Sequence, residues 1–211
     1  MTKKDWSAIT VIGAGVGLLI QPILSTLIGT AHADLLTWPL RFAVFVGFTI
    51  LAPLVLLVLY FVGKLMPVVY QFGKFAAVGV LNTFVDLGVL NLEIVAFGTP
   101  GAWVYRVFKT VSWIAATTNS FLWNKYWTFN SQEPASAKQT IEFYGVAFVG
   151  FLLNVGLASY VFSNVSRPVS VSANLWANIG ALVGVAAAFV WNFIGYKFWV
   201  FKEKGKQSQE E

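Results

Sequence analysis

The sequence predicts an all-α protein of the membrane: a polytopic bundle of six transmembrane helices that contains a duplicated two-helix unit. Two observations predict this fold. First, 57% of the 211 residues are hydrophobic and only 11% are charged, whereas soluble domains carry roughly 25% charged residues. Second, the pattern Lys-aromatic-Trp-x-Phe occurs at Lys125–Phe129 and again at Lys197–Phe201. The two copies are offset by about 72 residues, and a fixed offset of this kind indicates a duplicated structural unit.

Six segments are apolar over the roughly 20 residues that a membrane-spanning helix needs. The connections between them are short, and none has room for a separate soluble domain. The six predicted spans are residues 8–30, 41–63, 75–97, 103–124, 143–163 and 173–196.

The first of these segments has the features of a secretory signal peptide. Lys3 and Lys4 precede the apolar run, and Ala31-His32-Ala33 resembles a cleavage site. The run is about 22 residues long, however, and a signal core typically has about 7–15. We therefore expect a retained helix, with cleavage after residue 33 as the alternative.

The third to sixth segments make up the repeat. One offset of about 72 residues relates Lys125 to Lys197 and also Asn82 to Asn154. Two crossings return the chain to the side that it left, so the two copies are predicted to have the same orientation, as in a parallel repeat. The predicted organisation is an N-terminal helix pair at 1–70, a four-helix domain at 71–201 with repeat units 75–129 and 147–201, and a charged cytoplasmic tail at 202–211.

The distribution of basic residues predicts that both termini lie in the cytoplasm. With that orientation, ten basic residues lie inside and four outside, which follows the positive-inside rule. The inner set is Lys3, Lys4, Lys64, Lys74, Lys125, Lys138, Lys197, Lys202, Lys204 and Lys206, and the outer set is Arg41, Arg106, Lys109 and Arg167.

Several polar side chains fall within the predicted spans. Asn82 and Asp86 are four residues apart and share one helix face, and a carboxylate at this depth costs several kcal/mol unless it faces protein or water. One interpretation is a polar cavity between the repeats, open to the cytoplasm and closed by two lysines. The other is that the amides bond between helices and that Asp86 pairs with a lysine. The candidate residues are Asn82, Asp86, Asn124, Asn154, Asn192, Lys125 and Lys197.

Two tryptophans, Trp127 and Trp199, belong to the repeated pattern. Tryptophan beside lysine is a common anchor at the membrane boundary. Alternatively, the duplicated pair could stack on a sugar ring or an isoprenoid chain, beside lysines that hold a phosphate as point charges.

The composition and the missing motifs exclude several kinds of site. The chain has no cysteine and one histidine, which excludes a thiolate or multi-histidine metal site. No Gly-x-x-x-x-Gly-Lys-(Ser/Thr) phosphate loop is present, and no convergent acid–base set suits hydrolysis. We expect no enzyme activity, no catalytic residues, no metal or other cofactor, and no nucleic-acid partner.

Two motifs resemble those of the GtrA-like family of small polytopic membrane proteins. Residues 75–82, Phe-Ala-Ala-Val-Gly-Val-Leu-Asn, match its Phe-x-x-Val-Gly-x-x-Asn start. The helix ends match Asn-Phe-x-x-Asn-(Arg/Lys)-x-Trp-x-Phe with one departure in each copy: Ser120 replaces the leading asparagine in the first, and Tyr196 the later one in the second. The resemblance covers about 72–201 and leaves out the N-terminal pair.

The resemblance implies a function in handling polyprenyl-phosphate-linked sugars at a bacterial or archaeal cytoplasmic membrane. The leading hypothesis is a flippase that moves such a lipid to the outer leaflet for surface polysaccharide synthesis or glycosylation. The alternative is a non-transporting module that recruits or orients a glycosyltransferase partner. A homodimer is compatible with a protein of this size.

Overall fold

A computed structural model describes residues 1–28, 37–98, 101–131, 134–168 and 173–202. Within this part of the chain every regular element is helical, which confirms the all-α prediction. The chain forms two compact units, Met1–Asn130 and Ser131–Glu211. The elements are α1 (Lys3–Ile28), α2 (Trp38–Gly63), α3 (Pro67–Phe97), α4 (Ala102–Trp123), η2 (Asn124–Thr128), α5 (Ala137–Asn164), α6 (Ala173–Gly195) and η3 (Tyr196–Val200).

The described residues form six long helices as predicted, but not all six are apolar enough to cross a membrane. Five of the described helices are long and apolar enough to cross a membrane: α1, α2, α3, α5 and α6 with η3. The fourth predicted span, α4, is not among them, and it carries Arg106 and Lys109. The suggested cleavage motif Ala31–Ala33 lies outside the described residues.

Most helices begin earlier than hydropathy predicts, because capping residues lie upstream of the apolar runs. Thr2 and Asp5 form a capping box at the start of α1: the Thr2 amide donates to Asp5 Oδ2 (2.9 Å), and the Asp5 amide donates to Thr2 Oγ1 (3.1 Å). Helix α3 begins at Pro67 rather than near residue 75, since proline suits the first turn. The Ser136 hydroxyl caps α5 by accepting from the amide of Gln139.

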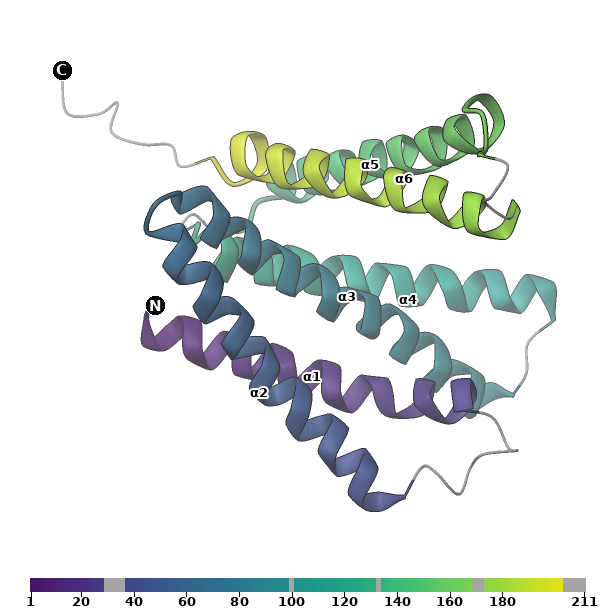
Figure 1. The fold of residues 1–211 in the computed structure, drawn as a ribbon, viewed down its shortest axis with the longest axis horizontal. Coiled ribbons are helices and arrows are strands. Elements are labelled where there is room, and N and C mark those ends of the chain that lie inside the picture. The colour runs from purple at the N-terminus through teal and green to yellow at the C-terminus, as the bar shows by residue number, and fades with distance from the viewer. Residues whose placement is uncertain (29–36, 99–100, 132–133, 169–172, 203–211) are drawn as a thin grey trace. The chain divides into compact units, whose positions relative to one another are not determined.

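In the first unit, α3 is the central helix, packed against α1, α2 and α4 (Figure 1). Helices α1 and α2 approach closely because α1 has glycines on the shared face. A Cβ at Gly13 would lie 2.5 Å from the backbone oxygen of Phe48, and one at Gly17 would lie 2.9 Å from that of Phe45. Small residues at four-residue spacing allow such backbone contact in a membrane.

The second unit is the helical hairpin of α5 and α6 (Figure 1). A Cβ at Gly180 would lie 2.9 Å from the backbone oxygen of Ala158, and one at Gly184 would lie 2.6 Å from Oδ1 of Asn154. The glycines of α6 therefore allow its close packing against α5, as their spacing in the sequence suggests.

Both hairpins end in a π-helical turn at matching positions. The Phe129 amide donates to the Asn124 carbonyl (2.9 Å), and the Phe201 amide donates to the Tyr196 carbonyl (2.8 Å). In each case a glutamine from the first helix of the hairpin donates to a carbonyl of the turn: Gln71 of α3 to Thr128, and Gln139 of α5 to Val200. The duplication seen in the sequence is thus repeated in the backbone, and single π-turns are frequent at functional sites.

Candidate functional site

The first π-turn, η2, is enclosed within its own unit. Lys125 has no exposed surface, and Trp127 is only 3% exposed. The indole nitrogen of Trp127 donates to Oδ1 of Asp5 (3.1 Å), the same carboxylate that forms an ion pair with Lys74. Trp127 is therefore held by α1 through a hydrogen bond, and it is not an exposed boundary anchor.

A second contact from α1 closes the same turn. The ammonium of Lys4 donates to the backbone oxygen of Tyr126 (2.6 Å) and to Oδ1 of Asn130 (3.0 Å). Asn130 has a φ of 48°, a left-handed conformation that asparagine tolerates. Sequence analysis named Lys4 and Lys74 only as basic residues near the membrane boundary, and it did not name Asp5. The capping pattern Thr2-x-x-Asp5 is a signal in the sequence, but it marks a helix start and not a long-range contact.

The second π-turn, η3, is more open. Trp199 is 54% exposed and meets Trp191 edge to face, with ring centroids 5.2 Å apart. The ammonium of Lys197 lies 5.7 Å from the ring centre of Phe193 and 5.6 Å from that of Phe198. Lys197 is half-buried, unlike Lys125. The two copies of one sequence pattern thus differ in access, and in the first unit α1 contributes to covering its copy.

Both hairpin ends contain an amide oxygen that is buried. Nδ2 of Asn124 donates to the hydroxyl of Ser120 (3.1 Å), but its Oδ1 accepts no hydrogen bond from the described residues. Oδ1 of Asn192 is likewise buried and without a donor in the described part of the chain. Leaving such an acceptor unpaired costs about 1–3 kcal/mol, so each oxygen is suited to a ligand that donates hydrogen bonds.

Polar side chains of α3 form hydrogen bonds and an ion pair with side chains of α4. Nδ2 of Asn119 donates to Oδ1 of Asn82 (2.7 Å), and one turn further along α3, Asp86 forms an ion pair with Lys109. The hydroxyl of Ser112 donates to the other carboxylate oxygen of Asp86 (2.7 Å). The interhelical contacts that one of the two interpretations predicts are thus present in this hairpin, and the lysine that pairs with Asp86 is Lys109 rather than one of the two motif lysines.

The sequence-predicted residues divide between the two units. Asn82 and Asp86 lie in the middle of the α3–α4 hairpin, while Asn154 lies where α5 meets Gly184. The first unit holds Asn82, Asp86, Asn124, Lys125 and Trp127, and the second holds Asn154, Asn192, Lys197 and Trp199.

The first unit also contains an apolar pocket of about 260 Å³ between α1, α2 and α3. Its walls include Ile12, Leu56 and Ala77, and none of the described residues that line it is charged. Among the described residues no three His, Cys, Asp or Glu side chains are grouped as metal ligands would be.

Long apolar helices, paired into hairpins with polar and cationic ends, define a multi-pass membrane protein. Residues 74–201 match the family model described as the GtrA/DPMS transmembrane domain, and the protein belongs to this family. The matched region runs from within α3 to the end of η3, so it contains both hairpins and leaves out α1 and α2.

A curated relative supports the same membership. The chain is 31% identical over 139 residues to the "Uncharacterized membrane protein YngA" of Bacillus subtilis (strain 168), an alignment that covers 66% of this chain and 84% of the relative. No solved structure matches the chain.

Proposed function

We propose that this protein moves a polyprenyl-phosphate-linked sugar from the cytoplasmic to the outer leaflet of a cytoplasmic membrane, with both termini in the cytoplasm. The lipid product would serve surface polysaccharide synthesis or glycosylation. Membership in the GtrA/DPMS family supports a function with polyprenyl-phosphate sugars.

The observation that carries the proposal is the combination of a lysine with a buried, unpaired amide oxygen at each hairpin end. Asn124 lies directly before Lys125, and Asn192 lies five residues before Lys197. The head group of the proposed substrate has a phosphodiester anion and several sugar hydroxyls. A lysine can bind the anion as a point charge, and hydroxyl donors would satisfy the amide oxygens.

The two ends have different parts in this proposal. Lys197 and Trp199 are accessible, so they would receive the phosphate and the sugar or isoprenoid first. Lys125 is fully buried and would act only after local opening, while Trp127 is already held by Asp5.

The chain has no phosphate loop for nucleotide hydrolysis. We favour transport that runs downhill as the lipid is consumed in the outer leaflet; the alternative is coupling to a gradient through Asp86 or Glu93.

We expect Lys197→Ala to slow translocation at least about tenfold, equivalent to about 1.4 kcal/mol of lost transition-state stabilisation. The measurement uses proteoliposomes with a polyprenyl-phosphate monosaccharide, whose sugar becomes accessible to an impermeant probe as it crosses. Lys138→Ala is the matched control, because Lys138 is highly exposed and pairs only loosely with Glu142 (3.8 Å). Combining Lys197→Ala with Lys125→Ala should abolish the protein-dependent rate.

A second candidate function is a module that binds the lipid and presents it to a glycosyltransferase. The exposed rings of Phe198 and Trp199 favour it, because exposed aromatic groups suit a protein partner. Translocation by the wild type no faster than in protein-free liposomes would favour this candidate. Co-purification with a membrane glycosyltransferase, weakened by Trp199→Ala, would then be the measurement.

A further inference from the structure

The α3–α4 hairpin contains a charged cluster that its repeat partner lacks. Asp86, Lys109 and Ser112 meet between the helices, through the ion pair and the hydrogen bond described above. At the same offset of about 72 residues the α5–α6 hairpin has Ala158, Ala181 and Gly184, all small and uncharged.

The second hairpin shows that this cluster is not needed to pack two such helices. There, Gly180 and Gly184 let α6 approach the backbone of α5 directly. An ion pair removed from water gives little net stability, because desolvation offsets much of the attraction. Charged groups within a membrane helix pair are expensive and usually functional, so a function explains the cluster better than packing does.

The geometry allows the Lys109 ammonium to leave the ion pair while the Asp86 carboxylate stays in place. Ser112 is fully buried, and its hydroxyl holds Oδ1 of Asp86. Lys109 reaches the other oxygen, Oδ2, with a side chain that is 43% exposed, compared with 24% for Asp86. A long, partly exposed lysine can turn its ammonium to another anion, whereas the shorter and anchored Asp86 cannot follow.

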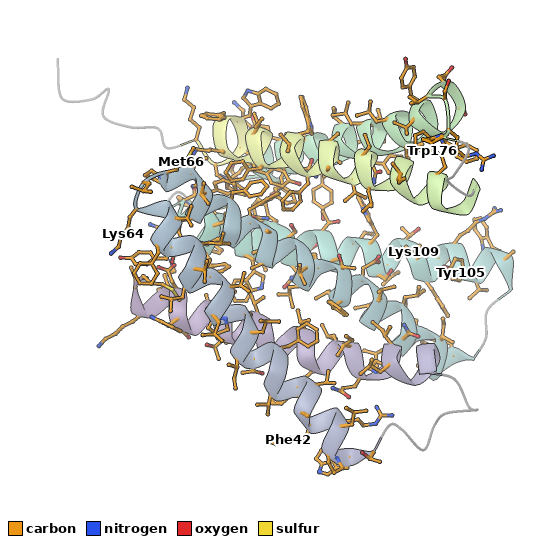
Figure 2. All side chains as sticks on the ribbon, viewed as in Figure 1. Phe42, Lys64, Met66, Tyr105, Lys109 and Trp176 are labelled. Carbon is orange, nitrogen blue, oxygen red and sulfur yellow. The ribbon has the colours of Figure 1, made fainter. Side chains whose placement is uncertain are left out.

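The position of Lys109 along α4 separates it from the hairpin end. Lys109 and Lys125 are 16 residues apart, which is about 24 Å along a helix, against a hydrocarbon core about 30 Å thick. In Figure 2, Lys109 lies in the part of α4 near the α3–α4 connection, while Lys64 marks the opposite end of the first unit, at the turn between α2 and α3. With the first π-turn at the cytoplasmic boundary, as the distribution of basic residues predicts, Lys109 would lie in the opposite half of the membrane.

We propose that Lys109 is a second phosphate site, which binds the head group of the translocated lipid in the leaflet opposite to Lys125. Asp86 is the internal anion that takes its place when the site is empty. This inference rests on the proposed translocation and adds the place where the anion arrives. Lysine and phosphate match as charge and acceptor, and exchange between Asp86 and the lipid phosphate keeps Lys109 neutralised in both states.

Chemical replacement of the lysine tests this site. The chain has no cysteine, so Lys109→Cys gives a protein with a single thiol. A methanethiosulfonate that adds an aminoethyl group restores a positive charge of nearly lysine length, and one that adds a sulfonatoethyl group places a negative charge there. Arg106→Cys is the matched control, because Arg106 is one turn away on α4 and exposed.

We expect Lys109→Cys to translocate a polyprenyl-phosphate monosaccharide at least about tenfold more slowly than wild type. The aminoethyl reagent should restore the rate to within about threefold of wild type, and the sulfonatoethyl reagent should not; a factor of three is within ordinary context dependence. Arg106→Cys should stay near wild type with either reagent. Wild type should also bind the lipid more tightly than Lys109→Cys, a difference that the aminoethyl reagent should reverse and the sulfonatoethyl reagent should not.

Two results would overturn the inference without touching the proposed function. One is wild-type translocation by Lys109→Cys in a protein of normal thermal stability. The other is normal translocation by the triple variant Asp86→Ala, Lys109→Ala, Ser112→Gly, which copies the residues of the second hairpin. If the wild type itself does not translocate the lipid, the proposed function fails instead, and the difference in lipid binding between wild type and Lys109→Cys decides whether phosphate binds at Lys109.

Discussion

Asp5→Ala is expected to be among the most destabilising single substitutions in this protein, with a loss of about 3–5 kcal/mol. The Asp5 carboxylate is 4% exposed and accepts from the Thr2 amide, the Thr2 hydroxyl and the Trp127 indole, besides pairing with Lys74. Its removal leaves the mostly buried Lys74 ammonium without its carboxylate and removes the acceptor of the indole. Thermal unfolding in detergent, followed by tryptophan fluorescence, measures the effect.

Two further variants distinguish a lost ion pair from a general disturbance of α1. Asp5→Ala combined with Lys74→Met should be less destabilised than Asp5→Ala alone, because no uncompensated charge remains. Glu142→Ala removes a partly exposed, loosely paired carboxylate and should change stability by no more than about 0.5 kcal/mol. Equal stability of Asp5→Ala and wild type would mean that the contacts of Asp5 do not hold the first π-turn.

Gly184→Val is expected to disrupt the α5–α6 hairpin. Even a Cβ at Gly184 would lie 2.6 Å from Oδ1 of Asn154 and 3.1 Å from its carbonyl carbon. Some of the atoms that a Cβ would meet belong to the backbone of α5, which cannot rotate away as a side chain can, so the two helices would have to separate. Overpacking typically costs about 1–3 kcal/mol, and a branched side chain against backbone belongs at or above the upper end. We expect Gly184→Ala to be destabilised and Gly184→Val to yield little folded protein on size-exclusion chromatography.

Gly156→Ala is the control for this substitution. It lies in α5, and a Cβ there would meet no atom within 4 Å. Alanine in place of a helical glycine favours the helix by up to about 1 kcal/mol, so this variant should be as stable as wild type or slightly more so. A similar response of Gly156→Ala and Gly184→Ala would show that the loss does not come from the contact with Asn154.

The number of long helices could be predicted from the sequence because each apolar run has the length of a membrane span, but α4 is not among the five candidate spans. The duplication was visible because Lys125, Trp127 and Phe129 recur at one offset, and the structure repeats it as two π-turns. The helix starts at Pro67 and Ala137 were missed by hydropathy, since the residues that begin these helices come before the apolar segments.

The difference between the two repeats could not be predicted. A repeat in the sequence implies equivalent environments for equivalent residues, yet Trp127 is buried and Trp199 is exposed. The cause lies outside the repeat, in Lys4 and Asp5 of α1, more than a hundred residues away in the chain. The pairing of Asp86 with Lys109 could not be predicted either. The sequence offers several lysines as partners, and a hydropathy pattern does not identify which residues meet between helices.

The contacts of α1 mean that the boundary of the family match is not a boundary for folding. The match begins at residue 74, inside α3, and would suggest a four-helix fragment as the shortest useful expression product. Such a fragment would separate Lys74 and Trp127 from Asp5, and would expose the wall of α3 that faces the apolar pocket. Truncation trials should therefore keep the chain from its first residues, and transplanting the hairpins into another protein would require a substitute for that single carboxylate.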